Sequence, residues 1–139
     1  MILSLVTAEK KVLSDMEIEE VIVPGFKGEL DILPGHAPLM TTLTAGIVRW
    51  RVAVSQTFES AAVGWGYCEV SPKGVVILAE TAETKDEVDK ERAILTFQKT
   101  EKLLNDPSLA ADEIEKLQRK MKRSQARIEL LNNTTHTQH

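Results

Sequence analysis

The first part of the chain alternates apolar and polar residues over short stretches. Across residues 48–54, Val48, Trp50 and Val52 are separated by Arg49 and Arg51, which is the period of a half-buried strand. The same criteria predict strands at 2–7, 18–23, 29–33, 40–43, 58–63, 66–70 and 75–79, with turns at 24–25, 34–35, 46 and 72–74. Many short strands at this spacing favour a sandwich or a barrel, and we expect an antiparallel β-sandwich over residues 1–84.

From residue 85 the apolar positions recur with a helical period. Asp86 is placed to cap a helix that runs from about residue 87 to residue 104. Its apolar stripe consists of Ala93, Phe97 and Leu104, with Val88 and Leu95 beside it. Pro107 ends this helix and starts the next one, because proline is tolerated only near the beginning of a helix.

The second helix carries a heptad-like seam. Its positions, at spacings of three and four residues, are Ile114, Leu117, Met121, Ser124, Ile128 and Leu131. Serine is the weak point of this seam. The short turn between the helices predicts an antiparallel two-helix hairpin over residues 85–131, and the polar residues 132–139 are expected to form a frayed tail.

Composition limits the class of protein. The 139 residues suffice for one compact domain with an appendage, and for a core that needs no disulfide. The single cysteine, Cys68, lies in an apolar run and is expected to be a small buried residue. No apolar stretch approaches the roughly 20 residues of a membrane span, and residues 1–6 lack the features of a signal peptide. Membrane association would therefore come only through a partner.

The formal charge of −4 conceals a local excess of positive charge. Residues 116–127 contain six basic side chains and no acidic one, and we call these six the basic block: Lys116, Arg119, Lys120, Lys122, Arg123 and Arg127. Overall acidity argues against general nucleic-acid binding, whereas the basic block favours one acidic target surface. The alternative is a solvated charged face, although a hairpin designed only for solubility would intersperse both signs.

Residues 28–46, GELDILPGHAPLMTTLTAG, contain a shaped loop with little reactive chemistry. The Pro-Gly pair at 34–35 is a turn signal, and Pro38 directs the residue before it toward an extended conformation. His36 has no second histidine or cysteine near it in sequence, so we predict no metal site. The side chains that an enzyme could use here are Glu29, Asp31 and His36. A docking surface fits the loop better than an active site does.

This segment resembles the epsilon subunit of F-type ATP synthases, whose pattern here is close to G-E-L-G-I-L-P-G-H-A-P-L. Residues 69–83 are similar to the run that closes the family's amino-terminal domain. The run VDKERA at residues 88–93 is similar to the aliphatic-D-x-x-R-A motif that opens its first carboxy-terminal helix. Asp31 stands where the family usually has glycine, and Trp65 interrupts what is commonly a Gly-Gly pair. Neither departure removes the core pattern.

The resemblance implies a non-catalytic rotor subunit of a proton-translocating ATP synthase. Its partners would be the gamma subunit, the c-ring and the alpha and beta catalytic subunits, on the cytoplasmic face of a bacterial plasma membrane. The sandwich would grip gamma and dock on the c-ring, and the hairpin would inhibit ATP hydrolysis when it extends along gamma. The resemblance implies no nucleic-acid partner and no required cofactor.

The resemblance also implies roles for particular residues. Glu29, Asp31 and His36 would dock on the rotor ring, and the basic block would meet the beta subunits. In some bacterial members the second motif binds regulatory ATP, with the corresponding residues here being Glu83, Asp89, Arg92, Lys99, Arg119, Arg123 and Arg127.

Plainer alternatives stay open at each of these positions. The docking loop could make hydrogen bonds within the sandwich, and Asp89 could form an intrahelical ion pair with Arg92. A free-standing adaptor could use the basic helix to bind an anionic membrane or nucleic acid. That helix lacks aromatic anchors and its apolar stripe is narrow, so the adaptor is the weaker hypothesis.

Overall fold

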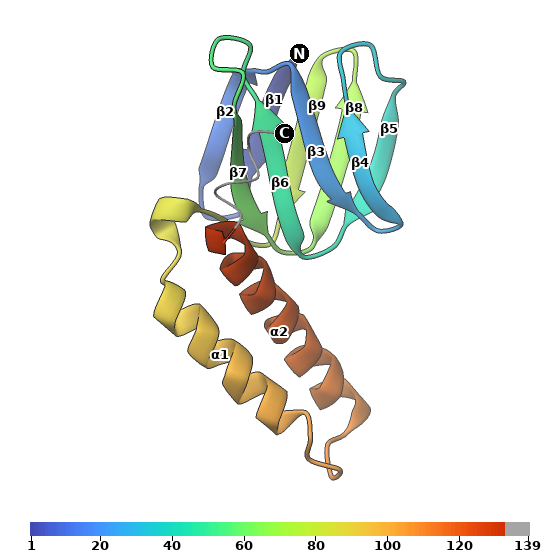
Figure 1. Cartoon of the computed structure of the whole chain (residues 1–139). Coiled ribbons are helices and arrows are strands. Elements are labelled where there is room, and N and C mark those ends of the chain that lie inside the picture. Colours follow the sequence, from blue (N-terminus) through green and yellow to red (C-terminus); the bar gives the residue numbers. More distant parts are fainter. Residues whose placement is uncertain (133–139) are drawn as a thin grey trace.

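The amino-terminal part of this computed structural model, which describes residues 1–132, is built from ten strands. These are β1 Ile2–Val6, β2 Lys11–Glu17, β3 Glu20–Gly25, β4 Gly28–Ile32, β5 Leu39–Leu43, β6 Gly46–Arg51, β7 Phe58–Val63, β8 Gly66–Ser71, β9 Gly74–Ala79 and β10 Ala82–Thr84. They follow the order β10-β7-β6-β3-β5-β8-β9-β1-β2, and β4 pairs with β3. The sheet folds over into two layers, with the helices below one end (Figure 1).

The predicted β-sandwich is confirmed, with one exception to its antiparallel pairing. Every recorded strand pair is antiparallel except β1 with β9, where Leu3 pairs with Val75 and Leu5 with Ile77. This pair joins the first strand to the ninth, so the start of the chain is fixed in the sheet by long-range hydrogen bonds.

The core between the two layers is aliphatic. Leu3, Leu5, Val21 and Ile32 are fully buried there, and each comes from the inward-facing side of its strand. Cys68 belongs to the same core, and its burial raises the pKa of its thiol to about 11. The expectation that this cysteine is a small buried residue is therefore confirmed.

Three details of the strand prediction were wrong. β6 ends at Arg51, and Val54, expected within this strand, is 98% exposed in the connection that follows. β2 was missed because it lies at the edge of the sheet, where its side chains have no clear alternation, and because it is irregular at Asp15, which has a positive φ of 50°. β10 was missed because it has only three residues.

The carboxy-terminal part is the expected helical hairpin. A 3₁₀ turn, η1 Lys85–Glu87, leads into α1 Lys90–Leu103, and α2 Ala111–Asn132 returns beside it (Figure 1). The fold class is thus confirmed as a sandwich followed by two helices. The tail predicted for residues 132–139 lies outside the described residues, apart from Asn132, which ends α2.

The start of α1 differs from the prediction. Thr84 and Glu87 form a capping box around η1, and Val88 is extended, so the first turn is separated from the helix proper. Asp89 caps α1 by accepting a hydrogen bond of 3.1 Å from the backbone N–H of Arg92. The expectation that Asp86 caps the helix was therefore wrong.

The helices bury small and polar side chains. Ala93 and Thr100 are buried on α1 and Ser124 on α2, whereas Leu95, expected beside the stripe, is 65% exposed. The Thr100 hydroxyl donates to the Thr96 carbonyl at 2.6 Å, and the Ser124 hydroxyl donates to a carbonyl of its own helix at 3.1 Å. These bonds satisfy the buried hydroxyls but add no contact between the helices.

Candidate functional site

The β4–β5 connection contains a tight turn at the end of the sandwich away from the hairpin (Figure 1). Pro34 and Gly35 occupy its centre, and the N–H of His36 donates to the Leu33 carbonyl at 3.0 Å. Gly35 has a φ of 87°, as the third position of a type II turn requires. The His36 Nδ1 lies 2.8 Å from the Ala37 carbonyl oxygen, and the side chain is exposed. His36 therefore faces solvent from the last position of a hydrogen-bonded turn.

A cleft of about 540 Å³ lies beside this connection. The β4–β5 connection forms one wall, the β8–β9 turn at Pro72 and Lys73 forms another, and Met1 closes one side. The end of the sandwich is consequently an irregular surface with a recess that could receive a protruding part of a partner.

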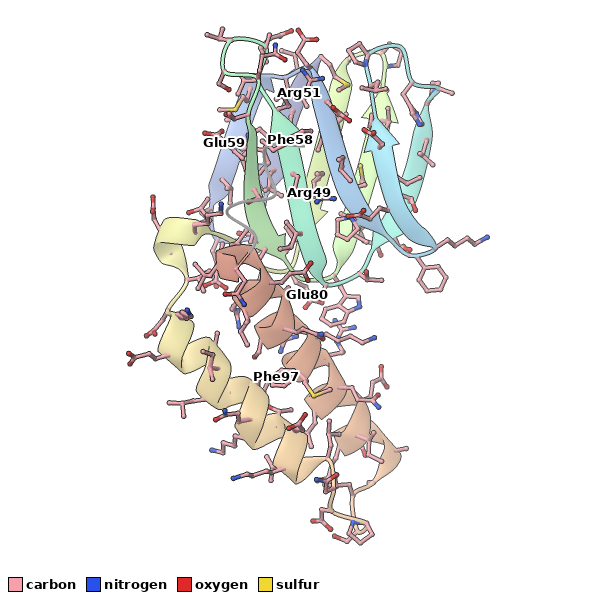
Figure 2. All side chains as sticks on the ribbon, viewed as in Figure 1. Arg49, Arg51, Phe58, Glu59, Glu80 and Phe97 are labelled. Carbon is pink, nitrogen blue, oxygen red and sulfur yellow. The ribbon has the colours of Figure 1, made fainter. Side chains whose placement is uncertain are left out.

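Glu29 and Asp31, the other two predicted docking residues, share the outer side of β4. The Arg49 Nη2 atom lies 2.8 Å from the Glu29 Oε2 atom, and Arg51 binds Glu20 at 3.2 Å on the same outer side of the neighbouring strands. Figure 2 labels both arginines on the face of β6. Sequence reasoning had placed the two arginines on one strand face but had not identified their acidic partners.

The Asp31 carboxyl has an altered acidity in this cluster. Desolvation, a hydrogen bond with Glu20 and the charge of Glu20 raise the pKa of Asp31 to about 6, against the lowering effect of Arg51 and Arg49. Asp31 therefore places a group that binds a proton near neutral pH on the predicted docking surface.

The outer side of strands β5, β8 and β9 exposes four large apolar side chains, which we call the apolar face: Met40, Tyr67, Val76 and Leu78. Tyr67 and Leu78 are cross-strand partners and are 56% and 53% exposed. Sequence reasoning missed this face, because residues 75–79 are apolar at every position and give no inward or outward side.

The basic block divides into two groups. Its arginines, at positions 119, 123 and 127, recur every fourth residue, so they share one side of α2 and are half-buried. Its exposed members are Lys116, Lys120 and Lys122. The six charges therefore do not form one surface.

Arg119 and Arg123 enclose an aromatic ring at the lower end of the sandwich. The guanidinium carbon of Arg119 lies 3.9 Å from the centre of the Trp65 ring, and that of Arg123 lies 5.9 Å from it. Arg119 also donates from Nη2 to the Glu80 Oε2 atom at 2.9 Å. Figure 2 labels Glu80 at this end, next to the helices. One guanidinium is thus held by a ring and a carboxylate together.

The end of α2 makes the remaining contact with the sandwich. Arg127 donates from Nε to the Glu83 carboxylate, and both side chains are about three-quarters buried, with 28% and 27% of each exposed. A small apolar cluster lies beside this ion pair, formed by Ile47, Ala62, Ala126 and Leu130 with half-buried Val88 against it. Leu130 is the one large, fully buried side chain among the described residues of the helices.

The residues predicted to bind ATP fall into two sets. Glu83 and Arg127 are in direct contact, and Arg119 and Arg123 lie at Trp65. The second set occupies exposed positions at the start and along the length of α1: Asp89, Arg92 and Lys99. Asp89 binds the backbone of Arg92, and the ion pair between these two side chains is not among those recorded for residues 1–132.

Residues 1–132 contain no cluster of three or more His, Cys, Asp or Glu side chains that could hold a metal ion. Neither described helix is both long and apolar enough to cross a membrane.

Comparison with known proteins decides the family. Residues 1–85 match the model of the ATP synthase delta/epsilon chain, β-sandwich domain. The chain belongs to this family. The ATP synthase epsilon chain of Bdellovibrio bacteriovorus is 41% identical over 127 residues, which cover 91% of each chain. An epsilon chain of Syntrophotalea carbinolica is 38% identical over 128 residues, which cover 92% of this chain and 91% of the relative. The family resemblance seen in the sequence is therefore confirmed.

A solved structure shows the same fold at lower sequence identity. A chain in the cryo-EM structure of Euglena gracilis mitochondrial ATP synthase, which contains OSCP, F1 and the c-ring, superposes with a TM-score of 0.78 at 18% identity. The match covers 98% of this chain and 81% of the other one. The arrangement of sandwich and hairpin is thus shared across most of both chains.

Proposed function

We propose that this chain is a non-catalytic subunit of the central stalk of a bacterial ATP synthase, located at the cytoplasmic face of the plasma membrane. The observation that carries the proposal is the match to epsilon chains over nine-tenths of the sequence, through the hairpin as well as the sandwich. Its partners would be gamma, the c-ring and the alpha and beta subunits. Co-purification with the other soluble subunits tests it, and elution alone or with lipid or nucleic acid would favour the adaptor instead.

Gamma would dock on the apolar face. Tyr67 and Leu78 are neighbours on this face, while Glu69 lies between Met40 and Val76. Large exposed apolar side chains grouped in this way often mark a binding surface, and side chains such as Tyr67 supply much of the affinity of protein interfaces. Tyr67→Glu should weaken binding to gamma about tenfold or more. Val54→Glu is the control, because Val54 is also an exposed apolar side chain but lies in the β6–β7 connection. Equal affinity of both variants for gamma would rule out the apolar face as the docking surface.

The c-ring would dock through Glu29, Asp31 and His36. Of these, His36 lies at the end opposite the hairpin, whereas Glu29 lies at the other end of β4, where it pairs with Pro24 beside the β3–β4 turn. The support is a hydrogen-bonded turn that presents an exposed histidine beside a recess. His36→Ala should reduce binding of the soluble complex to c-ring vesicles without changing binding to gamma. A loss of both would mean that the turn serves the fold of the sandwich and not the c-ring.

The hairpin would act as a brake on ATP hydrolysis. Its small buried side chains and its limited contact with the sandwich are what a movable element requires. Removal of residues 85–139 should leave assembly with gamma intact and raise ATPase activity; unchanged activity would refute the brake. Replacement of Lys116, Lys120 and Lys122 by glutamine should relieve inhibition if these exposed charges meet beta.

Regulatory ATP binding is the finer proposal for the hairpin. A triphosphate would have to compete with Glu80 for Arg119 and with Glu83 for Arg127, because both arginines already have carboxylate partners. Titration of the isolated chain tests this directly. No heat and no shift in melting temperature at millimolar ATP would exclude it.

A further inference from the structure

We propose that Trp65, Arg119 and Glu80 form a latch that sets how often the hairpin leaves the sandwich. The ring of Trp65 lies in the β7–β8 turn and Glu80 directly after β9, so both belong to the sandwich, while Arg119 belongs to α2. The Arg119 guanidinium contacts both at once, 3.9 Å from the ring centre and 2.9 Å from the carboxylate oxygen. The inference deepens the proposed regulatory role of the hairpin.

The latch is important for the attachment of the hairpin because few other contacts join α2 to the sandwich. The apolar cluster between α2 and the sandwich is small: it contains two large buried side chains, Leu130 and Ile47, and two alanines, with half-buried Val88 against them. Polar and cation–π contacts at Trp65, Glu80 and Glu83 therefore provide a large share of the attachment. Such contacts weaken with ionic strength, whereas the apolar cluster does not, so opening of the hairpin should depend on salt.

Trp65 supplies the aromatic part of the latch. The Gly64 that precedes it in the β7–β8 turn has no side chain that could replace the ring. A glycine at this position would leave Arg119 with the carboxylate alone, and Arg123 without the ring that it approaches at 5.9 Å. The tryptophan thus adds a cation–π contact for two arginines to an attachment that would otherwise consist of ion pairs and a small apolar cluster.

Thiol labelling of the full chain can test the latch. In Ala126→Cys, the new thiol lies in the contact between α2 and the sandwich and reacts only when the hairpin leaves. Cys68 serves as an internal control, because it is fully buried in the sandwich core and its thiol pKa is raised to about 11. One sample therefore reports opening of the hairpin and opening of the sandwich separately.

Trp65→Leu in this background should raise the labelling rate at position 126 about threefold to fivefold, the size of a partly exposed cation–π contact. Arg119→Gln should raise it by at least as much, because it removes the ion pair too. Lys120→Gln is the matched control: it deletes the same charge from the neighbouring, exposed residue and should leave the rate unchanged. In the double variant Trp65→Leu with Arg119→Gln, the labelling rate should rise by less than the product of the two single increases, because both substitutions remove the same contact.

Three results would overturn the latch. The first is an unchanged labelling rate at position 126 in Trp65→Leu. The second is an equal effect of Lys120→Gln and Arg119→Gln on that rate. The third is a parallel rise in labelling at Cys68, which would mean that the sandwich itself opens. The measurement uses the isolated chain, so it stands apart from the brake: unchanged ATPase activity after removal of residues 85–139 would refute the brake and leave the latch intact.

Discussion

The sandwich and the hairpin differ in what holds them together. The sandwich has a continuous aliphatic core and a sheet in which the first strand pairs with the ninth, so its contacts span its whole sequence. The hairpin buries two small alanines, two hydroxyl side chains and one leucine along its described helices. The first is built like an ordinary domain core, whereas the helices of the second pack against each other mainly through half-buried side chains.

This difference suits the two tasks proposed for them. A part that transmits torque should deform little, and a closely packed core joined by long-range strand pairing provides that stiffness. A part that changes place must be able to leave without unfolding its support. Because few apolar side chains bridge the two parts, the hairpin can be released at small cost while the sandwich stays folded.

The largest expected loss of stability comes from a substitution at Gly66, in the sandwich. A Cβ added there would lie 2.0 Å from the Leu78 carbonyl oxygen, which belongs to the neighbouring strand and cannot move without separating β8 from β9. Gly66→Ala should lower the free energy of unfolding by about 3 kcal/mol or more. Urea unfolding measures it, followed by the fluorescence of buried Trp50 in a Trp65→Leu background, where Trp50 is the one tryptophan. A loss below about 1 kcal/mol would contradict the picture of a stiff head.

The next largest effect is expected at the contact between the hairpin and the sandwich. Leu130→Ala removes the one large side chain that α2 buries against Ile47 and Ala62. It should cost about 2 to 3 kcal/mol of hairpin docking, with helix melting shifted to an earlier transition and the unfolding of the sandwich unchanged. Leu95→Ala is the control, since Leu95 is mostly exposed and its truncation should cost almost nothing. A single shifted transition would show that the two parts unfold as one.

Much of this fold could be predicted from periodicity. Short apolar or alternating runs between turn signals located eight of the ten strands within the described chain, and spacing of three and four residues located both helices. The missing strand β2 has its apolar residues at an edge, where one face is not required to be buried. The parallel pairing of β1 with β9 is a long-range choice that no local pattern encodes.

The candidate site could be predicted only in part. The spacing of Arg119, Arg123 and Arg127 placed them on one side of a helix, but their partners Trp65, Glu80 and Glu83 lie far away in sequence and reach them only through the fold. Trp65 was visible as a departure from the family pattern. Its contact with α2 required the position of the β7–β8 turn relative to the helix.

A smaller effect is expected at the ion pair between Glu83 and Arg127. Both side chains are largely removed from water, so Glu83→Gln should weaken hairpin docking by about 1 kcal/mol, between the values for exposed and for fully buried pairs. A double-mutant cycle with Arg127→Gln isolates the pair. The midpoint of the helix transition gives the measurement. An effect on the sandwich transition would mean that the pair stabilises β10 and not the hairpin.

The smallest effect is at the far end of the sandwich and depends on pH. Asp31 has a folded pKa of about 6 against an ordinary value of 3.8, so the folded chain holds its proton more tightly than the unfolded chain does. Its contribution to stability is complete below pH 3.8 and is lost as the pH rises through 6.

Asp31→Asn cannot ionise and keeps a donor for Glu20. It should therefore match the parent near pH 4 and exceed it above pH 6, by no more than about 0.5 kcal/mol because the side chain is exposed. Urea midpoints across this range measure the difference. A constant gap at every pH would mean that titration of Asp31 does not affect the fold, and a gap in the helix transition would mean that the two ends of the molecule are coupled.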